Sequence, residues 1–130
     1  MTMNSRARVG LRTAILVLLV ASLVYGCATF TRDSCRTLSI AATTYDTAMK
    51  SIADLYRQGK VTEEQKIKVL EIATEYWAAY HIATDALEAY MTVSSVDNEK
   101  RLEIAMMEFS KVLSKFMNYV QPIIAKGGEL

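Results

Sequence analysis

The sequence predicts an all-α fold, an antiparallel up-down-up bundle of three long amphipathic helices that follows a cleaved signal peptide. Three observations support this prediction. Apolar side chains recur every seven residues in two segments, which is the spacing of a helical seam in bundles and coiled coils. The 130 residues include one proline and five glycines, so helices meet few breakers. Two short polar segments, residues 57–65 and 92–100, divide the apolar pattern into three.

The first expected helix of the bundle covers residues 34–58. Leu38, Tyr45 and Ile52 lie seven residues apart and define one stripe on its surface. The expected alternate positions of this seam are Ala42, Met49 and Tyr56. The spacing therefore predicts a helix that buries one face against its neighbours.

The first polar segment predicts a tight connection between two helices. Gly59 suits the left-handed conformation that ends a helix, and Thr62 suits the N-cap of the next one. Gln65, three residues after Thr62, completes a capping box. Because the turn is short, we expect the two helices to be antiparallel neighbours.

The second expected helix runs from residue 63 to about residue 92 and has a wide apolar face. Its principal apolar positions are Ile67, Leu70, Trp77, Tyr80, Leu87 and Met91. Further apolar positions that widen this face are Ile72, Tyr76, Ala79, Ala83, Ala86 and Tyr90. A face of this width predicts a central helix that touches two neighbours, with apolar area left for self-association or a partner.

The third expected helix covers residues 98–121 or slightly more, after an N-cap at Ser94, Ser95 or Asp97. Its seam consists of Leu102, Phe109, Phe116 and Ile123, with Met106, Leu113 and Val120 between them. Pro122 lacks an amide hydrogen, so we expect it to end or kink this helix. The bundle domain is expected to span residues 34–126.

The N-terminus has the two parts of a secretory leader. Arg6, Arg8 and Arg12 give the first residues a positive charge, and residues 13–25 form an uncharged apolar run. As a helix this run is about 20 Å long, shorter than the roughly 30 Å hydrocarbon layer of a bilayer. A cleaved signal therefore fits this segment better than a permanent anchor.

The apolar run ends in Val24, Tyr25, Gly26 and Cys27, which resembles the lipobox of bacterial lipoproteins. The resemblance implies that signal peptidase II removes residues 1–26, and that the Cys27 sulfur carries a diacylglyceryl group. It also implies an N-linked acyl chain such as palmitate, with no other cofactor. Tyr25 departs from the small residue usual at its position. Residues 27–33 would then be the acylated N-terminus and tether.

Acylation of Cys27 would decide where the protein resides. Two or more acyl chains hold a protein stably on a membrane, whereas one chain binds reversibly. Ala28 stands where the sorting rule of the family would place an aspartate for retention in the inner membrane. The resemblance therefore favours the outer membrane of a bacterial envelope, with the protein facing the periplasm.

Charge and cysteine content narrow the partners. Loss of the three leader arginines reduces the 15 basic residues to 12, against 14 acidic residues, so nucleic acid is not an expected partner. Cys35 would be the one thiol left after lipidation. It is interpreted as a small apolar residue of the first helix, with an intermolecular disulfide as the alternative in an oxidising compartment.

No group of residues predicts catalysis or a metal site. His81 is the sole histidine, and Ala78 stands where a Glu-x-x-His metal motif would need glutamate. We interpret His81 as a solvated or hydrogen-bonded side chain that can pair with Asp85 one turn away. A serine, histidine and aspartate triad, a phosphate-binding glycine loop and a CxxC pair are all missing from the sequence. The protein is therefore expected not to be an enzyme.

The aromatic residues Tyr76, Trp77, Tyr80 and Tyr90 form the densest aromatic cluster of the sequence. They are interpreted as core and interface packing, or alternatively as a face for a ligand or partner. The leading functional hypothesis is a membrane-anchored envelope lipoprotein that acts as a structural or protein-interaction module through its helix faces. The alternatives are a helical-bundle carrier of a small apolar ligand and a phage-derived lysis or exclusion lipoprotein.

Overall fold

The structure is a computed structural model that describes the backbone of residues 5–128 and the side chains of residues 29–128. It contains α1 (Ser5–Arg57), α2 (Glu63–Thr92) and α3 (Val96–Gly128), and the described residues include no strand. The predicted all-α fold is confirmed. The chain divides into two compact units, Met1–Asp33 and Ser34–Leu130.

The predicted leader, residues 1–26, and Cys27 lie outside the residues whose side chains are described. Residues 27–33, expected as a tether, are helical and belong to α1. Within the described part of the chain, no helical segment is long and apolar enough to span a membrane.

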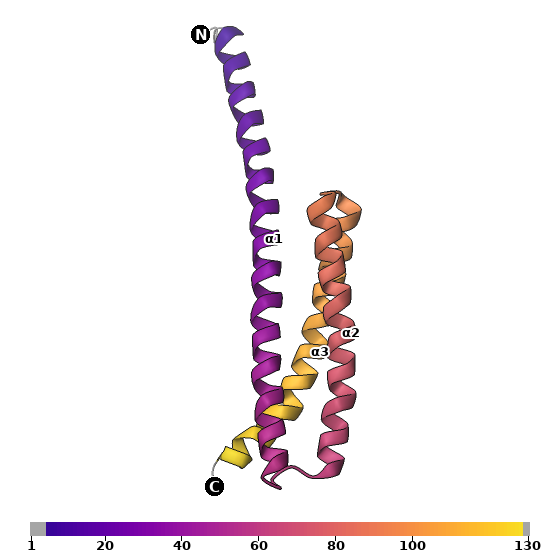
Figure 1. Cartoon of the computed structure of the whole chain (residues 1–130). Coiled ribbons are helices and arrows are strands. Elements are labelled where there is room, and N and C mark those ends of the chain that lie inside the picture. The colour runs from indigo at the N-terminus through magenta and orange to yellow at the C-terminus, as the bar shows by residue number, and fades with distance from the viewer. Residues whose placement is uncertain (1–4, 129–130) are drawn as a thin grey trace. The chain divides into compact units, whose positions relative to one another are not determined.

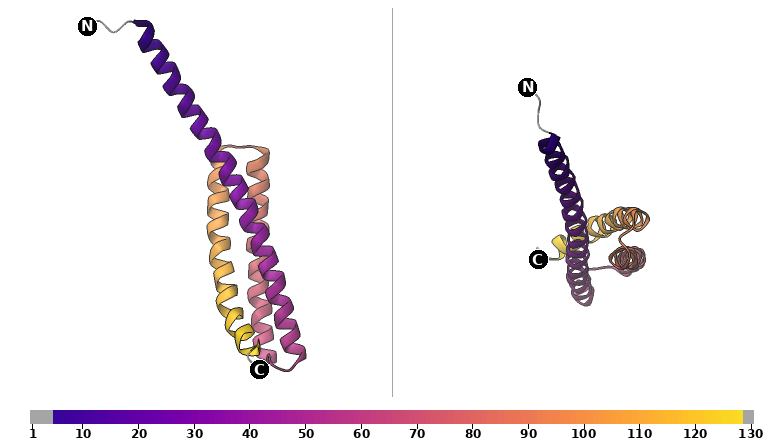
Figure 2. Two further views of the ribbon diagram at one scale, coloured as in Figure 1. Left: turned by 90° about the vertical axis from the view of Figure 1, so that its left-hand side faces the viewer. Right: turned by 90° about the horizontal axis from the view of Figure 1, so that it is seen from above.

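The second unit is the predicted three-helix bundle. Residues 34–57 of α1 lead down to the α1–α2 turn, α2 returns, and α3 runs back beside α2 (Figure 1). Figure 2 shows the C-terminal end of α3 beside the α1–α2 turn, so the order is up, down and up. All three helices contribute to one core.

The buried seam of α1 differs from the predicted one by one residue at every second position. Leu38, Tyr45 and Ile52 are buried as predicted. The alternate buried positions are Ala41, Ala48 and Leu55, whereas Ala42, Met49 and Tyr56 lie at the edge of the buried face. Ala41 and Ala48 flank Tyr45, whose ring contacts Tyr76 and Phe116 of the other two helices.

The buried face of α2 lies to one side of the predicted one. Its buried members are Val69, Ile72, Ala73, Tyr76, Ala83, Ala86, Leu87 and Tyr90. Ile67, Leu70, Trp77 and Met91, which were predicted as principal apolar positions, are exposed. Val69, Tyr76, Ala83 and Tyr90 form the middle of the buried face at seven-residue intervals. Leu70, Trp77 and Met91 each follow a member of this stripe by one residue, about 100° around the helix, and so lie to one side of it.

The seam of α3 is closer to its prediction. Leu102, Phe109, Phe116 and Val120 are buried, while Ala105 replaces Met106 at one alternate position. Met106, Leu113 and Ile123 are half-buried. The helix begins at Val96 and continues through Pro122 to Gly128, further than predicted. Its axis changes direction towards its end (Figure 1), as expected where proline removes one helical hydrogen bond.

Aromatic rings from all three helices form the middle of the core. Tyr45 of α1 stacks on Tyr76 of α2 with ring centroids 4.4 Å apart. Phe116 of α3 lies 5.0 Å from Tyr45 and 5.8 Å from Tyr76, and Phe109 lies 5.4 Å from Tyr76. These contacts place Tyr45 and Tyr76 at the same level of the bundle.

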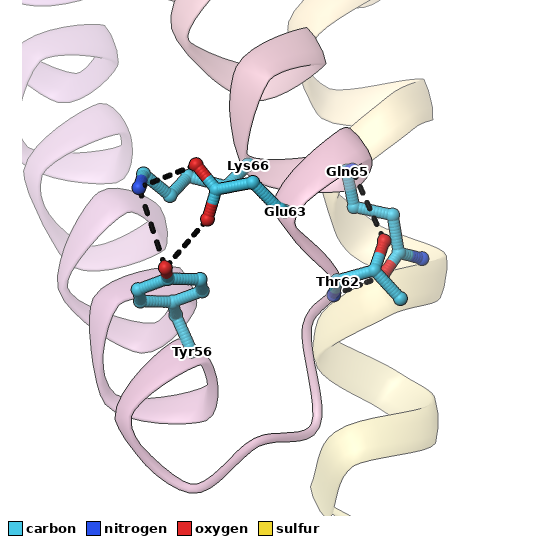
Figure 3. Close-up of polar contacts among 5 residues, drawn as sticks. All are labelled: Tyr56, Thr62, Glu63, Gln65 and Lys66. Atoms are coloured by element: carbon cyan, nitrogen blue, oxygen red, sulfur yellow. Dashed lines mark hydrogen bonds and ion pairs between the residues drawn. The ribbon is translucent and has the colours of Figure 1, made fainter.

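The α1–α2 turn has the predicted caps. Gly59 adopts φ 71°, and the amides of Gly59 and Lys60 donate to the carbonyls of Tyr56 and Leu55, which is a Schellman motif. The Thr62 hydroxyl accepts from the Gln65 amide, and the Gln65 side chain accepts from the Thr62 amide (Figure 3). The predicted helix end and capping box are therefore confirmed.

Two further contacts close the ends of the bundle. The Ser95 hydroxyl accepts from the Asn98 amide, so Ser95 is the residue that caps α3. At the other end, the Lys60 ammonium donates to the Gly127 carbonyl at 2.9 Å, which ties the end of α3 to the α1–α2 turn. Gly127 is buried against Leu55.

Candidate interaction face

An apolar groove runs between α1 and α2 on the outside of the bundle. It has a volume of about 390 Å³ and is lined by Met49, Ile52, Ala53, Tyr56, Arg57, Lys66, Val69 and Leu70. Ile52 and Val69 belong to the core and form its floor. Met49 and Tyr56 form one wall, and Leu70 forms part of the other.

Apolar side chains continue along α2 beyond this groove. Leu70, Trp77 and Met91 lie on one stripe at multiples of seven residues, with Thr84 between the last two. Their exposed fractions are 49%, 38% and 60%. We call the groove together with this stripe the α1–α2 face. An exposed apolar surface of this length is characteristic of an interaction site.

Trp77 is the residue of this face that is held most firmly. Its ring meets Tyr45 edge-on at 5.2 Å, Tyr76 at 5.7 Å and Tyr80 at 5.4 Å. The His81 ring lies 5.8 Å away on the solvent side. One side of the indole therefore packs against rings of the core, and its other side is exposed. Rigid aromatic side chains of this kind are frequent anchors of protein interfaces.

A polar cluster forms the rim of the groove beside the turn (Figure 3). The Tyr56 hydroxyl donates to the Glu63 carboxylate at 2.6 Å, and the Lys66 ammonium lies 2.9 Å from the same carboxylate. Lys66 also lies 4.5 Å from the centre of the Tyr56 ring and donates to its hydroxyl at 3.4 Å. The cluster joins the last turn of α1 to the first turn of α2.

These contacts shift the pKa values of the two charged groups in opposite directions. The hydrogen bond from Tyr56, and then that from Lys66, lower the pKa of Glu63 below its ordinary value. The hydrogen bond to Glu63 raises the pKa of Lys66. Both groups are therefore charged at neutral pH, and the apolar groove has a polar rim, as interfaces commonly do.

The structure separates the four aromatic residues that the sequence grouped. Tyr76 and Tyr90 are buried in the core, whereas Trp77 is exposed on the α1–α2 face and Tyr80 is half-buried between them. Tyr76 and Tyr90 share one heptad position, while Trp77 follows Tyr76 by one residue. Trp77 is thus the member of the group that a partner can reach most directly.

The Tyr76 hydroxyl lies in the core without a hydrogen-bond partner among the described residues. Burial raises the pKa of Tyr76 far above its ordinary value, and burial also raises the pKa of Tyr45, against an opposing contribution from Trp77. Both phenols therefore stay neutral at physiological pH. Both side chains contribute to the packing of the core.

Two other residues that the sequence analysis considered as functional candidates lie outside the aromatic core. His81 is exposed and touches Trp77, and Cys35 is an exposed free thiol. No three histidine, cysteine, aspartate or glutamate side chains of residues 29–128 are grouped as a metal site requires.

Sequence reasoning missed Met49, Tyr56 and Leu70 as surface residues, because it assigned them to the buried seams. The signal that separates them is the position of the smaller residues. Ala41 and Ala48 share a buried position with Leu55, one residue before the stripe that contains Met49 and Tyr56. Since both stripes are apolar, only the volume available next to Tyr45 and Tyr76 decides between them.

Comparison of the chain with protein-family models, with curated proteins and with solved structures gives no significant match.

Proposed function

We propose that this protein is a lipid-anchored, non-enzymatic interaction module of the bacterial cell envelope. In this proposal acyl chains on Cys27 hold the chain on the outer membrane, facing the periplasm. The bundle then presents its α1–α2 face to a protein partner. The observation that carries the interaction part is the row of exposed apolar side chains beside the groove, with Trp77 at its centre.

The anchor is supported by the leader sequence. Three arginines, an apolar run and the sequence Val24, Tyr25, Gly26 and Cys27 occur in the order that lipoprotein processing requires. A cysteine at this point supplies the sulfur for a thioether. Two or more acyl chains are sufficient for stable attachment.

An interaction role is favoured over a carrier role by the packing around Trp77. A carrier needs an enclosed apolar cavity that surrounds most of its ligand. Here the space next to Trp77 and Tyr80 is occupied by Tyr76 and Phe109, whose rings are in direct contact. The apolar surface that is left over is an open, elongated groove, which fits a helix better than a small molecule.

The anchor is tested by Cys27→Ser in intact cells, with Cys35→Ser as the matched control. We expect metabolic labelling with a palmitate analogue, and membrane attachment, to be lost in Cys27→Ser and retained in Cys35→Ser. Label that persists in Cys27→Ser would rule out the anchor.

The interaction face is tested with a photo-crosslinking amino acid placed in the full chain. We expect a probe at Leu70, on the α1–α2 face, to give a discrete crosslinked protein after irradiation of intact cells. The control position is Met107, which is similarly exposed but lies on α3. Equal crosslinking at both positions would contradict a specific face.

A further inference from the structure

Two stripes of opposite charge border the α1–α2 face. On α1, Arg36, Lys50 and Arg57 lie on one stripe at multiples of seven residues, and Thr43 occupies the remaining step. On α2, Glu64, Glu71 and Asp85 form a second stripe of this spacing, with Ala78 at its remaining step. All six charged side chains are exposed. On these two stripes the charges of α1 are basic and those of α2 are acidic. Neighbouring side chains carry the opposite sign, namely Asp46 and Asp54 on α1 and Lys66 and Lys68 on α2.

The two stripes are also in register with each other. Tyr45 and Tyr76 are level because their rings stack. In antiparallel helices with the same rise per residue, a residue that follows Tyr45 in α1 is level with the residue that precedes Tyr76 in α2 by the same number of positions. Lys50 lies five residues after Tyr45 and Glu71 five before Tyr76, so they are level.

The same count applies to the other members of the stripes. Arg57 and Glu64 each lie twelve residues from the stacked tyrosines, and Arg36 and Asp85 each lie nine residues from them in the other direction. The contact of Tyr56 with Glu63 agrees with this register near the turn. The uncharged steps, Thr43 and Ala78, are level as well, two residues from the tyrosines.

Within one chain these level pairs do not meet. Arg57 pairs with Asp54 and Glu71 with Lys68, each on its own helix. No ion pair of the described residues joins the basic stripe of α1 to the acidic stripe of α2. Both stripes point outward beside the groove and remain available to a partner.

We propose that the partner on the α1–α2 face is a second copy of this chain that stands parallel to the first. A twofold axis along the bundle keeps every residue at its own level. It places α1 of each copy beside α2 of the other, so that the basic stripe meets the acidic stripe at both contacts. Turning the second copy end over end would bring α1 against α1 and basic side chains against each other.

The apolar side chains between the stripes have the spacing that such an arrangement needs. Cys35, Ala42, Met49 and Tyr56 recur every seven residues on α1, and Leu70 and Trp77 do so on α2. Seven-residue spacing on both helices is what knobs-into-holes packing between helices requires. From Cys35 to Tyr56 the face is about 30 Å long and about two helices, roughly 20 Å, wide. This footprint is comparable to the roughly 800 Å² that each partner buries in a standard interface.

The inference rests on the proposed function in one respect. Two copies anchored at the same end to one membrane share an orientation, and the parallel arrangement is the one in which the charges match. The dimer itself depends on side chains of residues 35–85 and not on the acyl group.

The test uses two oppositely charged variants of the full chain in detergent micelles. In Arg36→Glu/Lys50→Glu two of the three charges of the α1 stripe become acidic, and in Glu71→Lys/Asp85→Lys two of the three charges of the α2 stripe become basic, while Arg57 and Glu64 are kept. We expect the wild-type chain to be dimeric by native mass spectrometry and each variant alone to dissociate at least tenfold more readily. An equimolar mixture of the two variants is expected to form a heterodimer with affinity close to that of the wild type.

The chain that carries all four substitutions is expected to dimerise with itself, since the charges are exchanged but still opposite. The substituted side chains are exposed, and circular dichroism checks that each variant keeps its helices. A monomeric wild-type chain, variants that dimerise like the wild type, or a mixture that does not recover would each overturn the proposal. A crosslink in cells from Leu70 to a different protein alone would overturn it too.

Acyl labelling and the charge-variant series, both measured on the chain with Cys27 intact, separate this inference from the proposed function. A chain that takes up no acyl label but dimerises with the expected dependence on the charges would remove the anchor and leave the dimer. A labelled chain whose dimerisation does not depend on the charges would remove the dimer and leave the anchor.

Discussion

Tyr76 and Trp77 are neighbours in the sequence and lie on two different faces of α2. Tyr76 is 0% exposed and touches rings from both other helices, whereas Trp77 is 38% exposed beside the groove. Each belongs to an apolar stripe with seven-residue spacing. Seven-residue spacing thus identifies a stripe that can pack against a helix, but it does not tell which stripe is buried. The other helices of this chain cover the stripe of Tyr76 and leave the stripe of Trp77 exposed.

The largest difference between the two faces is expected for truncation of large side chains. Phe116→Ala removes a fully buried ring that contacts Tyr45 and Tyr76, and we expect it to lower the free energy of unfolding by about 3–5 kcal/mol. Leu70→Ala on the α1–α2 face removes a side chain that is 49% exposed, so we expect less than about 1 kcal/mol.

Urea unfolding followed by circular dichroism measures both changes at a concentration where the chain is monomeric. In the assembled protein we expect the difference between the two losses of stability to be smaller, because Leu70 then becomes buried. A similar cost for both variants in the monomer would contradict the assignment of the two faces.

The sequence predicted the fold class and the first turn, since both depend on local chemistry. Gly59 supplies the left-handed residue, and Thr62 and Gln65 supply the reciprocal hydrogen bonds of a capping box. These contacts lie within a few residues of each other. They can therefore be derived without knowledge of the rest of the fold.

The choice of buried face was not predictable in the same way. On α1 the sequence offered Ala42, Met49 and Tyr56 as alternate seam positions, but Ala41 and Ala48 are buried instead. The reason is tertiary, because the rings of Tyr76 and Phe116 already occupy the space beside Tyr45. The larger apolar side chains of this part of α1, Met49 and Tyr56, therefore lie outside the core, although their size suggested burial. Met49, Tyr56 and Leu70 were assigned to the buried seams for the same reason, whereas Trp77 was among the residues of the predicted partner face.

Gly127 and Gly128, at the end of α3, are a second pair of sequence neighbours of which one is buried and the other exposed. A Cβ added to Gly127 would lie 2.5 Å from Leu55 Cδ2, while one added to Gly128 would meet no atom within 4 Å. We expect Gly127→Ala to cost about 1–3 kcal/mol through overpacking. Gly128→Ala is expected to be neutral or to stabilise the helix by up to about 1 kcal/mol.

Thermal unfolding of the two variants measures this difference. Combining Gly127→Ala with Leu55→Ala makes room for the added methyl group, so we expect the double variant to lose less stability than the sum of the two single losses. Additive losses would show that the contact with Leu55 is not the cause.

The smallest expected effect lies on the rim of the α1–α2 face. Tyr56→Phe keeps the ring beside Lys66 but removes the hydroxyl that donates to Glu63. Because that hydrogen bond is the main cause of the lowered pKa of Glu63, we expect this pKa to rise towards its ordinary value, while Lys66 keeps it somewhat lower. Carbon-13 NMR of the Glu63 carboxyl between about pH 2 and pH 7 measures the shift.

The sign of the linked stability effect follows from the lowered pKa. Glu63 in the folded chain releases its proton more readily than in the unfolded chain, so its contribution is present above the unfolded pKa and is lost as the pH falls through the folded pKa. Tyr56→Phe should therefore flatten the dependence of stability on pH in the acidic range. Lys68→Gln is the control, since Lys68 pairs with Glu71 and leaves Glu63 untouched. If Tyr56→Phe left the Glu63 titration unchanged, the rim would be held by Lys66 alone, and the aromatic hydroxyl would have no part in joining α1 to α2.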